Sequence, residues 1–148
     1  MDIKIIAIGR EKSGPVRDLC AEYLKRMSWK ISVEELVAKN KGAGSAEETD
    51  LLLKNIKDSW TVVALDLRGE TLSSEDFAKK IGKWQMTGQT LAFVIGGADG
   101  FDERLRKRAN FLLSFGKQTW PHMMVRVMLL EQVYRAQQIL AGHPYHRA

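Results

Sequence analysis

The sequence predicts an α/β fold in which a mostly parallel sheet is flanked by helices. Two observations carry this prediction. Short apolar runs typical of buried strands alternate along the chain with segments in which apolar residues recur at helical spacing. Such alternation is typical of parallel sheets, because each helix returns the chain to the edge at which the next strand begins. With 148 residues, 45% of them apolar, the chain fits a single domain over residues 1–148.

The first half of the chain predicts three strands and two helices. Residues 3–8 form an apolar run that ends at a glycine, which predicts the first strand. A proline suited to a first helical turn opens a helix over residues 15–29. A less regular alternation predicts a strand over residues 31–37, and acidic residues in the first turn favour a helix over residues 47–59. Residues 61–67 form the clearest buried strand.

The second half continues the same alternation. A third helix begins at Ser73 with a pattern that resembles a capping box, and it ends at Gly88. The apolar run over residues 91–95 predicts a fourth strand. A short basic helix is expected over residues 102–109, followed by a fifth strand over residues 111–115.

The last helix, expected over residues 123–141, is apolar at seven of the eight positions 123–130. A surface helix needs only one apolar stripe, so this half must be covered on more than one side, and a partner subunit is the economical explanation. Arg126 is the one charge in the run. A buried guanidinium must be paired or face a polar site, so a salt bridge and an active-site role both remain open.

Composition indicates the setting in which the protein works. The formal net charge of +5 favours an anionic partner such as nucleic acid. Cys20 is the single cysteine and cannot form an intramolecular disulfide, so a cytoplasmic protein is expected. The first residues predict a strand instead of a signal peptide, and no membrane span is predicted. The basic, glycine-rich loop over residues 39–45 is the expected mobile region.

The residues that could carry chemistry gather in the last third of the chain. All three histidines lie in the final 27 residues, among arginines, tyrosines and a tryptophan that can neutralise phosphate or stack on a base. No second cysteine accompanies them, so no metal site is expected. Gly96 and Gly97 end a strand, which fits either a plain turn or close approach of the backbone to a ligand. Asp66 also follows an apolar run, where it could bind a ribose hydroxyl or turn the chain.

Five blocks of sequence occur in a specific order and spacing. They cover residues 65–70 with 72–75, 93–100, 113–115 with 119–122, 124–127 with 130–136, and 143–147. The second block reads Phe-Val-Ile-Gly-Gly-Ala-Asp-Gly, and the last reads His-Pro-Tyr-His-Arg. Together they resemble the large-subunit ribosomal RNA pseudouridine methyltransferase H family, a bacterial member of the SPOUT class. The resemblance runs from Met1 to Ala148.

The resemblance implies an enzyme that uses S-adenosyl-L-methionine to methylate N3 of a pseudouridine in a hairpin loop of the large-subunit (23S) ribosomal RNA. It implies that the substrate is the assembled ribosome. It also implies a homodimer, in which the C-terminal part of each chain passes through a loop to form a deep trefoil knot. The periodicity of the sequence alone would indicate an ordinary doubly wound sheet, because knots are almost absent from protein topologies.

Carried onto the matching positions, the resemblance implies a cofactor pocket made largely by the backbone of three adjacent loops. Small residues suit a pocket that holds adenine with main-chain N–H and C=O groups. The cofactor-binding residues it implies are Leu65, Gly96, Phe115, Gly116, Lys117, Gln118, Thr119 and Trp120.

The implied reaction transfers a methyl group from a sulfonium to an imide nitrogen, so the protein must align the two reactants and assist loss of the N3 proton. The expected catalytic residues are His122, Arg126, Tyr145, His146 and Arg147. The sequence leaves open which of them accepts the proton. The C-terminal tail is expected to close over a flipped-out nucleotide beside the cofactor of the partner subunit.

Two alternatives remain at this point. The first is a SPOUT methyltransferase with a different RNA target, which would keep the knot and the cofactor pocket. The second is a non-catalytic RNA-binding or ribosome-associated protein that uses the same basic residues. Cofactor binding separates the second alternative from the first, because an RNA-binding protein has no need of a pocket built from Gly96, Gly97 and the loop over residues 115–120.

Overall fold

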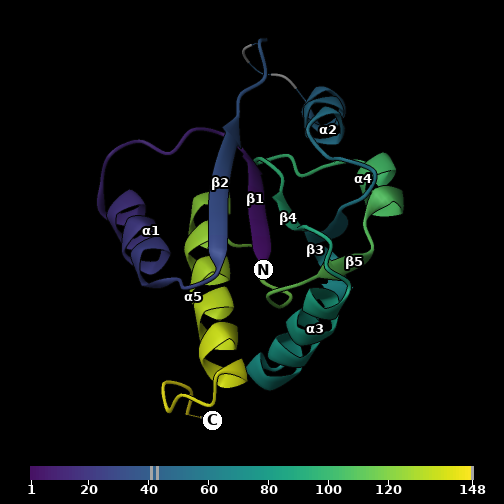
Figure 1. The fold of residues 1–148 in the computed structure, drawn as a ribbon. Coiled ribbons are helices and arrows are strands. Elements are labelled where there is room, and N and C mark those ends of the chain that lie inside the picture. The colour runs from purple at the N-terminus through teal and green to yellow at the C-terminus, as the bar shows by residue number, and fades with distance from the viewer. Residues whose placement is uncertain (41, 43, 148) are drawn as a thin grey trace.

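The computed structural model describes residues 1–40, 42 and 44–147 of the chain. Its strands are β1 (Asp2–Ile8), β2 (Lys30–Leu36), β3 (Thr61–Glu70), β4 (Leu91–Ile95) and β5 (Phe111–Leu113). Its helices are α1 (Pro15–Arg26), α2 (Ser45–Lys54), α3 (Ser74–Met86), α4 (Glu103–Arg108) and α5 (His122–Leu140). The strands form one parallel sheet in the order β2-β1-β4-β3-β5 (Figure 1). The predicted α/β fold is therefore confirmed.

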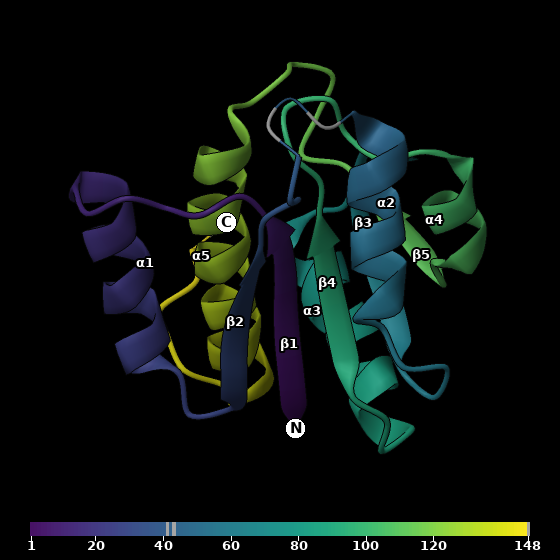
Figure 2. The ribbon, with the colours of Figure 1, turned by 90° about the horizontal axis from the view of Figure 1, so that it is seen from above.

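Helices cover both faces of this sheet. Figure 2 shows α1 and α5 on one side of the strands and α2 and α4 on the other, and α3 lies with α1 and α5. Successive side chains of a strand point to opposite faces, so Ile5 packs in the core beneath α1, α3 and α5, whereas Ile6 packs in the core beneath α2 and α4. Both faces of the central strands are buried, which explains why β4 and the first half of β3 are apolar without alternation, whereas the edge strand β2 alternates.

Several predicted boundaries shift by a few residues. The helix predicted to reach residue 29 ends at Arg26. The side-chain oxygen of Gln137 on α5 accepts hydrogen bonds from the backbone N–H groups of Ser28 and Trp29, at 2.8 and 3.2 Å. Those amides are therefore satisfied without another helical turn. Of the predicted mobile loop, Lys41 and Ala43 lie outside the described residues, and its mobility stays a prediction.

The apolar first half of α5 is covered largely by its own chain. The helix packs against both α1 and α3, and Val127, Leu129 and Leu130 are buried. Met124 is still 39% exposed. That a partner subunit covers the rest of this helix stays a prediction. The trefoil knot also stays a prediction.

Arg126 ties α5 to the carboxyl ends of β1 and β2. Its guanidinium is 3% exposed and donates to Glu35 Oε2 at 2.5 Å, and to the carbonyl oxygens of Ile8 and Gly9 at 3.2 and 2.7 Å. Glu35 also accepts the backbone N–H of Glu11 at 2.6 Å. Burial alone would raise the pKa of Glu35, but these hydrogen bonds outweigh it and lower the pKa. The salt-bridge reading of Arg126 is thus confirmed.

Replacing Arg126 should destabilise the fold far more than replacing an exposed arginine. We expect Arg126→Met to lower the free energy of unfolding by about 3–5 kcal/mol, because Glu35 would remain partly buried without its cation. The control is Arg26→Met, which breaks an exposed pair with Glu22 and should cost about 1 kcal/mol or less. Urea unfolding of the three proteins measures both changes. Equal midpoints for the two variants would contradict the structural role of Arg126.

Gly69 lies where β3 approaches β5 most closely. The pairing of these strands is interrupted between Leu65 and Glu70, both of which face Leu113. A Cβ atom on Gly69 would stand 2.6 Å from the carbonyl carbon and oxygen of Leu112. Only a residue without a side chain fits here.

We therefore expect Gly69→Ala to lower the free energy of unfolding by about 1–3 kcal/mol through overpacking against the backbone. The control is Gly82→Ala within α3, where the new methyl group would meet Leu140 at an ordinary 3.4 Å. That change should stabilise the protein by about 0.5–1 kcal/mol, because alanine favours a helix interior over glycine. Thermal unfolding of both variants measures the change in the free energy of unfolding. A change in the same direction for both variants would rule out overpacking at Gly69 as the cause.

Candidate functional site

A cavity of about 320 Å³ lies at the edge of the sheet where β3, β4 and β5 end. Parallel strands bring their carboxyl ends to the same edge, so the loops that follow these strands meet there. Figure 2 shows the loops after β4 and β5 above the ends of the strands. The cavity volume falls in the range of small-ligand sites. Its lining comes from three stretches and the start of the last helix, namely residues 65–67, 95–101, 113–120 without 117, and Arg106, His122 and Val125.

Glycines shape the wall that follows β4. A Cβ atom on Gly96 would stand 3.0 Å from the carbonyl carbon of Gly100, and the N–H of Gly100 donates to the carbonyl of Gly97 at 3.0 Å. Gly100 has a φ of +70°, which favours glycine. The turn is therefore tight, and both glycines of the pair line the cavity. The structure thus shows a turn at this position, and contact of its backbone with a ligand stays a prediction.

The loop after β5 is held by two of its own side chains. The hydroxyl of Ser114 accepts the N–H of Gly116 at 3.1 Å and lies 3.0 Å from the carbonyl of the same residue. The indole N–H of Trp120 donates to the carbonyl of Phe115 at 3.3 Å. Gly116 has a φ of +109°. These contacts give the loop a fixed shape with its backbone against the cavity, and they end β5 at Leu113 instead of at Phe115.

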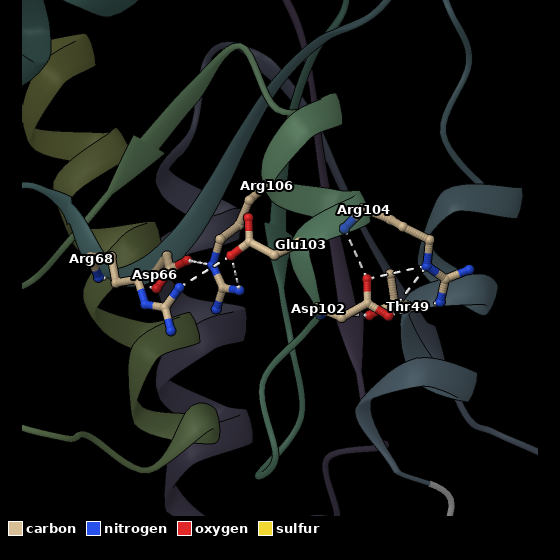
Figure 3. Close-up of polar contacts among 7 residues, drawn as sticks. All are labelled: Thr49, Asp66, Arg68, Asp102, Glu103, Arg104 and Arg106. Atoms are coloured by element: carbon tan, nitrogen blue, oxygen red, sulfur yellow. Dashed lines mark hydrogen bonds and ion pairs between the residues drawn. The ribbon is translucent and has the colours of Figure 1, made fainter.

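An ion pair closes the side of the cavity next to α4. Asp66 is nearly buried, with its side chain 6% exposed, and its carboxylate pairs with the guanidinium of Arg106. The same carboxylate accepts the backbone N–H of Arg68 at 3.0 Å (Figure 3). Both charged residues line the cavity. Asp66 therefore lies within β3 and does not end the strand, and its charge is already neutralised by Arg106.

The other arginines of α4 are engaged as well. Arg104 pairs with Asp102 at 2.8 Å, and Glu103 accepts from Arg106 at 3.0 Å (Figure 3). Arg104 also pairs with Asp50. Arg108 donates to the backbone carbonyls of Lys57 and Trp60 at 2.9 and 3.1 Å. The short basic helix is therefore bound to its own chain, and it does not present these three arginines as unpaired cations.

His122 begins α5 at the rim of the cavity. His122 and Arg126 both lie close to Gly9. A Cβ atom built on Gly9 would be 3.5 Å from Nε2 of His122 and 3.9 Å from Nη2 of Arg126. Burial and, secondarily, the charge of Arg126 lower the pKa of His122 below its usual value. The imidazole is therefore neutral at pH 7 and can accept a proton or a hydrogen bond.

The structure brings together seven of the eight residues that the sequence assigns to the cofactor. Leu65, Gly96 and all of residues 115–120 except Lys117 line the cavity, and the side chain of Lys117 is exposed. Of the five predicted catalytic residues, only His122 lines it. Arg126 lies behind His122 in the pair with Glu35.

The predicted catalytic residues of the tail lie elsewhere on the same chain. The hydroxyl of Tyr145 donates to Glu131 at 3.1 Å, and the Nε2 atom of His146 lies 2.7 Å from Glu75. Arg147 is exposed. Within the described residues of one chain, the tail and the lining of the cavity have no member in common.

Sequence reasoning missed the polar part of the cavity wall. It did not assign Arg106 or Ser114 to the site, although both line the cavity. A signal exists for Ser114, since a serine two residues before a glycine is typical of a local hydrogen-bonded turn. No local pattern indicates Arg106, because its partner Asp66 lies 40 residues away in the sequence.

The part of the chain that the structure describes lacks both a metal site and a membrane-spanning helix. No group of three histidine, cysteine, aspartate or glutamate side chains there could hold a metal ion. In residues 1–40, 42 and 44–147, no helix is both long and apolar enough to span a bilayer.

Solved structures of low sequence identity share this fold. A probable methylase family protein from Haemophilus influenzae is 12% identical, with a TM-score of 0.60 over 99% of this chain and 70% of that one. A proposed methyltransferase from Legionella pneumophila, in complex with the bound cofactor SAM, is 11% identical, with a TM-score of 0.52 over 93% of this chain and 66% of that one. At such identities the likeness concerns the fold alone.

Comparisons of sequence are more specific. The model of the family described as predicted SPOUT methyltransferase matches residues 1–146. Proteins named ribosomal RNA large subunit methyltransferase H are 51% identical in Rhodospirillum centenum, over all of both chains, and 46% identical in Paramagnetospirillum magneticum, over 99% of both. The chain therefore belongs to the SPOUT methyltransferase family, in the group of the ribosomal RNA large subunit methyltransferases H.

Proposed function

We propose that this protein methylates large-subunit ribosomal RNA, with S-adenosyl-L-methionine as the methyl donor. The finer proposal is methylation of N3 of a pseudouridine in a hairpin loop of the 23S RNA, on assembled ribosomes, by a homodimer. One observation carries the proposal of an RNA methyltransferase: the sequence is about half identical, over its whole length, to relatives named ribosomal RNA large subunit methyltransferase H. The cavity at the carboxyl edge of the sheet supports the choice of cofactor.

The cavity suits S-adenosyl-L-methionine in volume and in chemistry. Its walls after β4 and β5 are backbone shaped by Gly96 and Gly116, which leaves main-chain N–H and C=O groups to recognise an adenine edge. The residues that would hold the cofactor are Leu65, Gly96, Phe115, Gly116, Gln118, Thr119 and Trp120. When bound, the cofactor supplies a methyl group already activated by its sulfonium.

We assign acceptance of the N3 proton to His122. It is the one predicted catalytic residue among the described lining of the cavity, and its lowered pKa keeps the imidazole neutral at pH 7. Arg126 acts behind it, because its positive charge helps to hold that pKa down. Tyr145 suits a different role. Burial and the nearby Glu131 carboxylate raise the pKa of its phenol, so it serves as a hydrogen-bond donor.

The separation of tail and cavity supports a homodimer. In one chain the tail packs on α3 and α5, whereas the cavity lies at the carboxyl edge of the sheet. A second copy would bring the tail of one chain to the cavity of the other and complete the site. Trp120 and Met124 remain 40% and 39% exposed beside the start of α5, and a partner would cover such apolar surface.

A methyl-transfer assay tests the proposed function. The protein should move a labelled methyl group from S-adenosyl-L-methionine to ribosomes from a strain that lacks this gene. Mass mapping should then find one new methyl group on a pseudouridine of the large subunit. A methyl group on another RNA would indicate a SPOUT methyltransferase with a different target. Absence of both transfer and cofactor binding would contradict the proposal and favour an RNA-binding protein.

The role of His122 predicts a specific pH dependence. A lowered pKa means that the imidazole is protonated only at acid pH, so turnover should fall as the pH drops through a value below 6.5. His122→Gln should lower turnover at the alkaline plateau about 10²-fold and remove this acid limb, with cofactor affinity unchanged within a few-fold. Glu34→Gln is the control, because this exposed glutamate on β2 belongs neither to the lining of the cavity nor to the tail. If the fall in turnover at acid pH persists in His122→Gln, a group other than His122 accepts the N3 proton.

A further inference from the structure

Tyr145 in the C-terminal tail makes three polar and aromatic contacts with α5 and one contact within the tail. The hydroxyl of Tyr145 donates to Glu131 Oε1 at 3.1 Å. The ring of Tyr145 meets the ring of Tyr134 edge to face, with centroids 4.9 Å apart, and the guanidinium of Arg135 lies 4.9 Å from the same ring. Within the tail, the backbone N–H of Tyr145 donates to His143 Nδ1 at 3.2 Å. The aromatic side chain is thus held from three sides.

His146 is held between a carboxylate and a guanidinium. Its Nδ1 atom lies 3.0 Å from Nη1 of Arg135, and its Nε2 atom lies 2.7 Å from Oε1 of Glu75. An arginine can only donate, so Nδ1 must be the acceptor and carry no proton. The proton of the neutral ring is then on Nε2, which donates to Glu75. These two partners fix the tautomer of His146.

The anchor of this arrangement is itself rigid. Arg135 and Glu131 lie one turn apart on α5, and Glu131 Oε1 accepts from Nη2 of Arg135 at 2.6 Å and from Nε at 3.0 Å. Both side chains are mostly buried, at 23% and 17% exposure. Nε of Arg135 also lies 3.4 Å from Glu131 Oε2, and this set of charge-assisted hydrogen bonds restricts both rotamers. The tail therefore binds to a preformed surface of the helix.

The anchor also borders a second cavity. Glu131 lines a cavity of about 550 Å³ whose wall includes residues 113–116. The same residues line the candidate cofactor cavity from the other side. Glu131 thus contacts the tail and also lines the second cavity, and Arg147 of the tail is exposed.

We propose that Glu131, Arg135 and Glu75 are positioning residues that hold Tyr145 and His146 in one conformation, with His146 as the Nε2–H tautomer. We call these three residues the tail clamp. This inference rests on the proposed function, because the clamp matters for catalysis only if the tail binds the RNA nucleotide. The clamp orders the tail before RNA arrives, so binding does not have to bear the entropy of ordering it. His146 then serves as a hydrogen-bond donor and not as the proton acceptor.

The clamp is tested in the full-length protein by NMR and by methyl transfer to ribosomes. Imidazole ¹⁵N shifts report the tautomer of His146, and heteronuclear relaxation of the Tyr145 and His146 amides reports the order of the tail. The variants are Arg135→Met, which keeps the apolar stem but removes the donor, and Glu75→Ala, which removes the acceptor. Glu34→Gln on β2 is the control, because this exposed glutamate lies outside the clamp.

We expect the wild type and Glu34→Gln to show one Nε2–H tautomer and an ordered tail. Arg135→Met should show both tautomers and a mobile tail. Its KM for ribosomes should rise about tenfold, the effect of losing one hydrogen bond to a charged group, with cofactor affinity unchanged. Glu75→Ala should act in the same direction. Glu75→Gln, which keeps an acceptor oxygen, should restore most of the order and the KM.

Two results would overturn the clamp. One is a wild-type His146 that exchanges between tautomers in a mobile tail. The other is a wild-type KM for ribosomes in both Arg135→Met and Glu75→Ala. A wild-type protein that shows the fixed tautomer and ordered tail, yet transfers no methyl group to any RNA, would overturn the proposed function and support the clamp as a structural feature.

Discussion

The buried guanidinium of Arg126 constrains the end of the sheet at which the candidate site lies. A charge at this depth must be compensated by partners, and here they are the Glu35 carboxylate and the carbonyls of Ile8 and Gly9. These partners sit at the carboxyl ends of β2 and β1. The start of α5 is therefore fixed over that edge of the sheet, and His122 is placed one helical turn before Arg126 at the rim of the cavity.

The shape of the other cavity walls depends on glycines, which have no side chains. Gly96 fits against Gly100 within the loop after β4, and Gly69 of β3 fits against the backbone of Leu112 on β5 beside the cavity, so at both places the chain approaches as closely as backbone allows. The ion pair of Asp66 with Arg106 closes the side that these segments leave open. The cavity is thus made by backbone on two sides and by a neutralised pair on a third, which suits a ligand recognised mainly through main-chain hydrogen bonds.

The sequence predicted the order and type of the elements well because periodicity is a local property. Every predicted strand and helix is present, and the capping of α3 by Ser73 occurs as expected, with its hydroxyl accepting the N–H of Asp76 at 3.0 Å. Contacts between distant residues were beyond reach. Nothing local indicates that Gln137 ends α1 by accepting the amides of Ser28 and Trp29, which lie more than 100 residues away in the sequence.

The same distinction applies to the site. The residues assigned to the cofactor were found because the resemblance carries whole motifs, and seven of the eight line one cavity. The catalytic set was harder, because its members have similar chemistry and differ in what surrounds them. Burial and Arg126 keep His122 neutral at the cavity, whereas Glu75 and Arg135 occupy both nitrogens of His146. Two histidines of one sequence thus have different surroundings, which is the basis for proposing proton acceptance by the first and hydrogen-bond donation by the second.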